Sequence, residues 1–101
     1  MAIAYVFEWD TDDRRTDGFD AVIRHTRMLD DPPPGLLSVA AGHAPDGLFR
    51  IFEVWETAAD REAFERTRLM AAIDAVPDAS GGAPHRESAY ELHLFSSEVP
   101  A

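Results

Sequence analysis

One uninterrupted segment, residues 46–69 (DGLFRIFEVWETAADREAFERTRL), constrains the fold of this chain more than any other. In its first half, residues 48–56 alternate between the two faces of an extended chain, and both faces are mostly apolar, which is typical of a strand. Thr57 and Asp60 then form the T-x-x-D pattern of a capping box, which predicts the start of a helix. The segment therefore predicts a turn, a strand and a capped helix in direct succession.

Glu53 is the unusual residue of this predicted strand. Period-2 alternation places it on one face with Phe49, Ile51 and Trp55. An ionised carboxylate is not buried without a partner except at a large cost. We therefore expect Glu53 at an edge, in a pocket or paired with a cation, and the partners considered are Arg24, Arg27 and Arg86.

The rest of the chain alternates between strand and helix patterns. Apolar alternation predicts strands at residues 2–9, 35–42, 48–56 and 86–95. Helical spacing predicts one helix with the stripe Phe19, Val22, Ile23, Thr26 and Leu29, and a second with the stripe Phe64, Leu69, Ile73 and Val76. The order β-α-β-β-α-β predicts an α+β, ferredoxin-like antiparallel sheet with both helices on one face. We expect a single domain over residues 1–101, with an ordered core of about residues 2–96.

The second face of this sheet needs a cover. Two helices cover only one face of a four-stranded sheet, yet the predicted strands are apolar on both, as at Tyr5 and Val6 or Ile51 and Phe52. Large exposed apolar patches are unusual on monomers. A second copy of the chain, packed sheet against sheet by two-fold symmetry, is the simplest cover, so we expect a homodimer.

Composition excludes several classes of function. The net charge of −10 disfavours nucleic acid and anionic membrane surfaces as partners. The chain has no Cys, Lys, Asn or Gln, which excludes thiol nucleophiles, thiolate metal sites and Schiff bases. No pair of His residues has metal-ligand spacing with a third carboxylate, so we expect neither a metal nor another cofactor. No apolar run is long enough to span a bilayer and the N-terminus lacks a signal-peptide pattern, so we expect a cytoplasmic protein.

Five stretches together carry a family resemblance: PPPGLLSVAAG, DG, FRIFEVWET, AFERTRL and YELHLF. From Ile3 to about Phe95, the chain resembles the antibiotic biosynthesis monooxygenase-like group of dimeric α+β barrel proteins. The resemblance implies a ferredoxin-like monomer, a homodimer, and a pocket between sheet and helices in each subunit. Members of the group include cofactor-free oxygenases of aromatic polyketides, polyketide cyclases, haem-degrading enzymes and proteins without known activity.

The resemblance carries over to individual residues unevenly. Trp55 matches a strand-end Trp common to the group, and His93 matches a His on its last strand. The quinone-forming oxygenases also use an Asn near the place of Ile51, and this chain has none. Many relatives carry a His where Val39 stands, and the haem degraders need a His on the second helix, which here has none. Haem breakdown is therefore not expected.

Two residues are the candidate catalytic groups. Glu53 could act as a general base made stronger by desolvation, and His93 as a proton shuttle. The alternatives are an Arg-paired Glu53, and a His93 that is half-exposed or bonded at the dimer interface. His43 and His85 fall in a turn and a loop, where we expect solvent exposure.

A second group of residues is the candidate binding surface. An aromatic pocket for a flat, hydrophobic ligand is expected from Trp55, Tyr5, Phe7 and Phe49, with Trp9 beside them. The alternative for each is plain core packing. His25, on the shoulder of the first helix, could overhang the mouth of this pocket or simply face solvent.

Three functions follow from these residues. The first is a cofactor-independent monooxygenase of aromatic or polyketide secondary metabolism, in which the deprotonated substrate itself donates an electron to oxygen. The second is a polyketide cyclase or isomerase that uses the same acid and base groups without oxygen. The third is a non-catalytic small-molecule-binding or accessory dimer.

Overall fold

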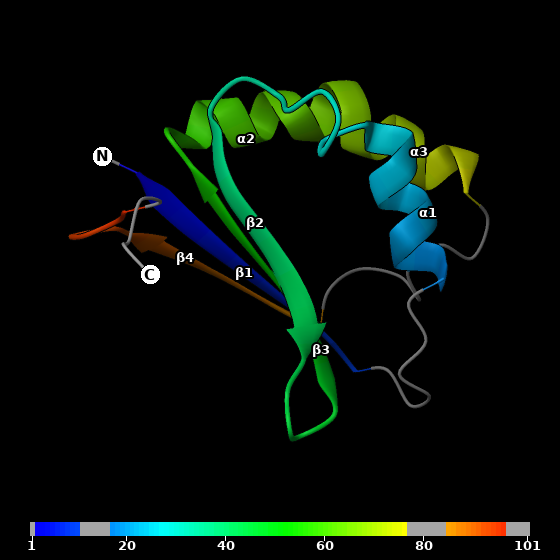
Figure 1. Cartoon of the computed structure of the whole chain (residues 1–101), viewed down its shortest axis with the longest axis horizontal. Coiled ribbons are helices and arrows are strands. Elements are labelled where there is room, and N and C mark those ends of the chain that lie inside the picture. The colour runs from blue at the N-terminus through cyan, green and yellow to red at the C-terminus, as the bar shows by residue number, and fades with distance from the viewer. Residues whose placement is uncertain (1, 11–16, 77–84, 97–101) are drawn as a thin grey trace.

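The computed structural model describes residues 2–10, 17–76 and 85–96. Four strands form one antiparallel sheet: β1 (Ile3–Asp10), β2 (Leu36–His43), β3 (Leu48–Trp55) and β4 (Arg86–Glu91). The strand order is β2-β3-β1-β4. Helix α1 (Asp17–Thr26) and the helical run from α2 (Ala58–Phe64) to α3 (Met70–Ala75) lie on the same side of the sheet (Figure 1). The ferredoxin-like fold expected from the sequence is confirmed.

The predicted strand faces are also confirmed. Every second residue of β3 is buried, at Phe49, Ile51, Glu53 and Trp55. In the β1–β3 register Tyr5 lies opposite Glu53, and Phe7 lies opposite Ile51. Paired residues share a face of the sheet, so these side chains all point toward the helices.

Helix α1 is shorter than its apolar pattern predicts. It ends at Thr26, and the next residue, Arg27, has a φ of 59°, which a continuing right-handed helix does not allow. The Thr26 hydroxyl donates to the Ile23 carbonyl and accepts from the Met28 backbone N–H. Because the chain turns here, Met28 becomes buried and Leu29 is left 66% exposed, so the predicted stripe is wrong at Leu29.

The second helical region begins as predicted. The Thr57 hydroxyl oxygen accepts from the Asp60 backbone N–H at 3.1 Å and also donates to the Asp60 carboxylate at 2.9 Å. Gly35 packs directly against this cap, because a Cβ at Gly35 would overlap the Asp60 side chain. Gly35 also has a φ of 87°, so only glycine fits well between β2 and the start of α2.

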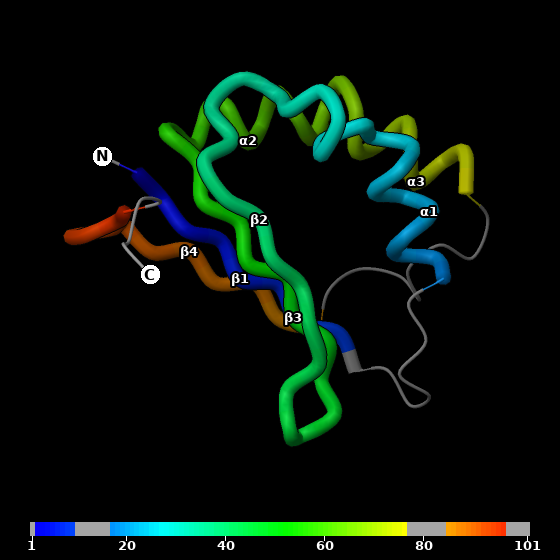
Figure 2. Tube along the Cα trace, viewed as in Figure 1, coloured from blue at the N-terminus to red at the C-terminus, as the bar shows by residue number. Residues whose placement is uncertain are grey.

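A π-helical turn, η1 (Glu65–Leu69), joins α2 to α3, and Figure 2 shows the three segments as one continuous coil. A π turn adds one residue to the helix and rotates everything that follows it. After this turn Ala72 is fully buried against Val22 of α1, whereas Ile73 is 39% exposed. Ala72 and Ile73 both follow Leu69 on the same helix face, at i+3 and i+4, and Ala72 takes the buried place, so the prediction of Ile73 in the buried stripe is wrong.

Strand β4 is also shorter than expected. The predicted strand reached Phe95, but β4 ends at Glu91, opposite Ile3. One more bond, from the Leu92 N–H to the Ala2 carbonyl, continues the contact with the start of β1. The pairing of β4 with β1 then stops, because β1 begins at Ile3 and has no further residues for β4 to pair with.

Among the described residues, no helix is long and apolar enough to cross a membrane.

Candidate functional site

The side of the sheet that faces the helices carries a row of aromatic rings. The rings of Tyr5 and Phe7 stack with centroids 6.1 Å apart and planes within 6°. The row continues to Trp9, 6.3 Å from Phe7, and to Phe49, 6.5 Å from Trp9. We call Tyr5, Phe7, Trp9 and Phe49 the aromatic strip. Phe7 and Phe49 are buried, whereas Tyr5 and Trp9 are half-buried and keep part of their surface accessible.

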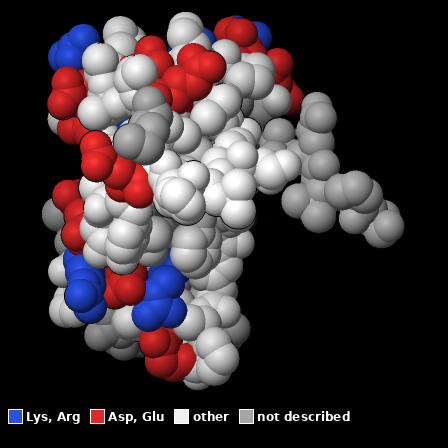
Figure 3. Space-filling view, turned by 90° about the vertical axis from the view of Figure 1, so that its left-hand side faces the viewer, with Lys and Arg blue, Asp and Glu red and all other residues white. Residues whose placement is uncertain are grey.

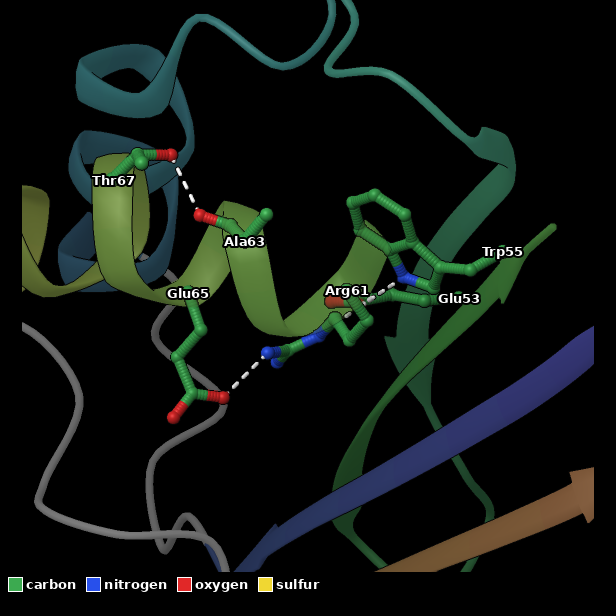
Figure 4. A network of polar contacts seen from close by, with 6 residues as sticks. All are labelled: Glu53, Trp55, Arg61, Ala63, Glu65 and Thr67. Atoms are coloured by element: carbon green, nitrogen blue, oxygen red, sulfur yellow. Dashed lines mark hydrogen bonds and ion pairs between the residues drawn. The ribbon is translucent and has the colours of Figure 1, made fainter. Parts of the chain in front are cut away.

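Glu53 lies beside this strip, and one of its carboxylate oxygens accepts two hydrogen bonds. Its Oε1 accepts a hydrogen bond from Trp55 Nε1 at 2.9 Å and another from Arg61 Nε at 2.8 Å (Figure 4). Glu53 is 7% exposed and Trp55 is completely buried. The expectation that Glu53 has a cationic partner is confirmed, but the partner is Arg61 rather than Arg24, Arg27 or Arg86.

Arg61 reaches the sheet from helix α2. It comes three residues before the buried Phe64 and so lies on the same helix face. Its guanidinium carbon is 5.1 Å from the Phe7 ring centroid and 5.8 Å from that of Tyr5, within the range of cation–π attraction. Its Nη1 donates to Glu65 at 2.6 Å. We call Glu53, Trp55, Arg61 and Glu65 the Arg61 network.

Arg61 was not among the expected site residues, although the sequence contains a signal for it. A helix that starts at Thr57 and buries Phe64 must also turn Arg61 toward the sheet, because i and i+3 share a face. Only the tendency of arginine to remain on helix surfaces argued against it. The long apolar stem and stacked guanidinium allow burial here because Glu53 supplies the opposite charge.

His43 occupies a different place from the one predicted. It was expected in an exposed turn, but it is the last residue of β2 and is half-buried. It pairs with Phe49 across the strands, and the two ring centroids are 5.0 Å apart. Its Nε2 is buried and has no hydrogen-bond partner among the described residues. Val39, Ala41 and His43 alternate onto one face of the strand. The predicted strand ended at residue 42, and one more residue would have placed His43 on the face that carries the aromatic rings.

The other two candidate histidines are exposed. His93 was predicted on the last strand, but it follows the end of β4 and is exposed. That placement is wrong because β1 offers no further residues for pairing. His25 is in the last turn of α1 and is exposed.

The aromatic strip thus has a polar group near each end. The Arg61 network adjoins it at Glu53 and Tyr5, and His43 adjoins it at Phe49. Glu53 and Phe49 are four residues apart along β3, which is about 13 Å at the rise of a strand. Within the described ranges, no three His, Asp or Glu side chains gather as potential metal ligands. Phe7 and Phe49 belong to a buried core cluster with Ile51, so only the half-buried Tyr5 and Trp9 offer ring surface to a flat apolar molecule.

Comparisons with solved structures identify the fold. A candidate antibiotic biosynthesis monooxygenase from Chloroflexus aurantiacus matches with a TM-score of 0.71 and 15% identity, over 95% of this chain and 97% of that one. SnoaB, described as a cofactor-independent oxygenase from Streptomyces nogalater, matches with a TM-score of 0.65 and 14% identity, over 96% and 98% of the two chains. This chain has the fold of the antibiotic biosynthesis monooxygenases.

A candidate antibiotic biosynthesis monooxygenase from Nitrosomonas europaea supports the same conclusion, with a TM-score of 0.69, 16% identity and 94% coverage of each chain. No family model matches the sequence, and no curated protein matches it. The likeness to these solved structures confirms the expected resemblance at the level of the fold.

Proposed function

We propose that this protein is a cofactor-independent monooxygenase that acts on flat aromatic compounds of secondary metabolism. The observation that carries the proposal is the aromatic strip with the buried, unpartnered Nε2 of His43 beside it. An unpartnered nitrogen in an apolar setting is costly unless a ligand or a water molecule completes it. The fold shared with SnoaB, itself a cofactor-independent oxygenase, supports the same reaction class.

The proposed reaction needs only a base, an apolar surface and oxygen. For an anthrone, a side chain removes one proton from the methylene carbon to give a carbanion. The carbanion passes one electron to O₂, and the two radicals combine into a peroxide. Loss of water then leaves a quinone, so one anthrone and one O₂ give one quinone and one H₂O. The aromatic strip would hold the rings and exclude water.

We assign the proton transfer to His43 in this proposal. Its Nε2 has no competing partner in the part of the chain that the structure describes, whereas the Glu53 carboxylate already accepts from Arg61 and Trp55. Glu53 would then position Trp55 and Arg61. The same test decides whether Glu53 is the base instead, and His93, exposed beyond the end of β4, is the weaker candidate.

The test is oxygen uptake by chelator-treated protein with an anthrone substrate, corrected for spontaneous oxidation. His43→Phe keeps a ring beside Phe49 but removes the base, so kcat should fall by about a hundredfold or more. Glu53→Gln keeps an acceptor for Trp55 and should retain far more activity. The reverse ranking would make Glu53 the base, and an equal loss in both variants would leave neither residue assigned to the proton.

The two other functions are outcomes of this experiment. Ligand binding with product formation but without oxygen uptake would indicate a cyclase or isomerase. Binding without any product would indicate an accessory protein. Each outcome would replace the oxygenase proposal.

We also propose that the protein works as a cytoplasmic homodimer. On the face of the sheet away from the helices, Phe52 is 45% exposed and Tyr90 is 55% exposed. Val6 pairs with Phe52, and Ala4 pairs with Tyr90, so the exposed apolar groups are contiguous. Figure 3, which views the molecule from the left-hand side of Figure 1, shows an uncharged area between groups of charged residues.

At the end of this face, charged side chains pair with one another. Arg50 Nε donates to Glu8 at 2.8 Å, and Arg50 Nη2 donates to Asp46 at 3.1 Å. The Leu48 backbone N–H and the Arg50 guanidinium hold the pKa of Asp46 below its usual value. The apolar area is therefore bordered by charges, as expected of a protein interface rim.

A further inference from the structure

Arg61 has two carboxylate partners that differ sharply in burial. The side chain of Glu53 is 8% exposed, whereas that of Glu65 is 54% exposed. The Arg61 side chain itself is 8% exposed. One ion pair of this guanidinium is therefore internal, and the other reaches the solvent.

The two pairs differ in how easily they can be exchanged. Separating Glu53 from Arg61 would leave a buried charge without compensation, and it would also disturb the bond to Trp55 Nε1. Glu65 keeps more than half of its side chain in water, so its carboxylate stays solvated when this pair is separated, while Glu53 still compensates Arg61. Glu65 is thus the replaceable partner and Glu53 the fixed one.

The geometry places the replaceable pair next to the aromatic strip. Glu65, in η1, points from the same side of the helix as Arg61 (Figure 4). The Arg61 guanidinium also lies over the rings of Tyr5 and Phe7. Because the guanidinium itself covers these rings, a ligand beside the half-buried Tyr5 would meet Arg61 from the side of Nη1, where Glu65 now accepts a hydrogen bond.

We propose that Arg61 recognises an acidic oxygen on the aromatic ligand, a carboxylate or an ionised phenol or enol, and that this oxygen takes the place of Glu65. The proposal rests on the proposed function in one respect, because it assumes that the ligand lies on the aromatic strip. It adds that the ligand is an anion when bound. A chain with a net charge of −10 repels anions in general, so their selection requires a local cation such as this one.

Two fluorescent probes of equal ring size test the proposal: 9-anthracenecarboxylate, which is an anion, and 9-anthracenemethanol, which is neutral. Binding is measured by the anisotropy of the probe. The wild-type protein should bind the carboxylate about tenfold more tightly than the alcohol, as expected of one charge-assisted hydrogen bond.

Glu65→Gln gives the sharper prediction. It removes the competitor for Arg61 and should tighten carboxylate binding by about threefold to tenfold, with no change for the alcohol. Glu62→Gln, on the exposed surface of the same helical run, makes the same change in net charge and serves as the control. It should leave the affinities for both probes as they are in the wild-type protein.

A double variant removes the cation without leaving a buried charge. Glu53→Gln combined with Arg61→Met should bind the two probes equally. Equal binding of the probes by the wild-type protein, or equal effects of Glu65→Gln and Glu62→Gln, would overturn the role of Arg61 and leave the proposed binding surface intact. If neither probe binds the wild-type protein, both this inference and the aromatic binding surface are wrong.

Discussion

At the scale of single residues, the decisive feature is a buried carboxylate that is compensated from two directions. Glu53 accepts from Arg61 on a helix and from Trp55 two residues along its own strand. The cost of burying two charges is met by their attraction and by the additional bond from the indole. The pair thereby fixes how helix α2 sits on the sheet.

The first prediction concerns this pair. Arg61→Met should lower the free energy of unfolding by about 3–5 kcal/mol, because Glu53 is then buried without a cation. Adding Glu53→Gln should recover most of the loss, since no unpaired charge remains. Urea denaturation of the wild-type protein and the variants measures the effect. If the double variant is no more stable than Arg61→Met, the two charges are not coupled.

The sequence identified some of these residues and not others, for physical reasons. Strand alternation depends only on local geometry, so the shared face of Phe49, Glu53 and Trp55 was predictable. The partner of Glu53 depends on how a helix packs over the sheet, and nine arginines were available. His43 was missed because strand ends are set by pairing with a neighbour, which local pattern does not show.

At the scale of elements, the π turn η1 determines which side chains α3 buries. It separates Phe64 from Leu69 by five residues while both remain in contact with the core around Met28 and Trp55. A regular helix would not place residues five apart on one face. The sequence contains this spacing, but from Leu69 both Ala72 and Ile73 lie on the same helix face, and the more apolar Ile73 was the natural choice for the buried position.

The second prediction tests this shift. Ala72→Leu should destabilise the protein by about 1–3 kcal/mol, because a larger side chain does not fit against Val22. Ile73→Ala should cost less than about 1 kcal/mol, because Ile73 is partly exposed. Urea unfolding of both variants is the measurement. A larger loss from Ile73→Ala than from Ala72→Leu would mean that Ile73, and not Ala72, is the residue packed against α1.

At the scale of the whole molecule, the sheet divides the protein into two surfaces of different character. One face packs aromatic rings beneath the helices, and the other leaves Phe52 and Tyr90 exposed. The strand order of the sheet was predictable from the order of the elements. The described residues leave the second face partly exposed, and the homodimer that would cover it stays a proposal.

The third prediction addresses that cover. Phe52→Glu places a charge in the middle of the apolar outer face and should convert a dimer into a monomer. Met70→Glu is the matched control, because Met70 is 49% exposed but lies on helix α3. It should leave the mass unchanged. Light scattering after size exclusion measures both, and a monomeric wild-type protein would contradict the proposed homodimer.

The two tryptophans of the chain give the protein an intrinsic optical reporter for each end of the aromatic strip. Trp55 has no exposed surface and donates to the carboxylate that holds Arg61, so its emission responds to changes in the Arg61 network. Trp9 lies beside Phe49, the ring that also contacts His43. In Trp9→Phe, the remaining emission would report the arginine end alone, so unlabelled compounds could be sorted by the end at which they bind.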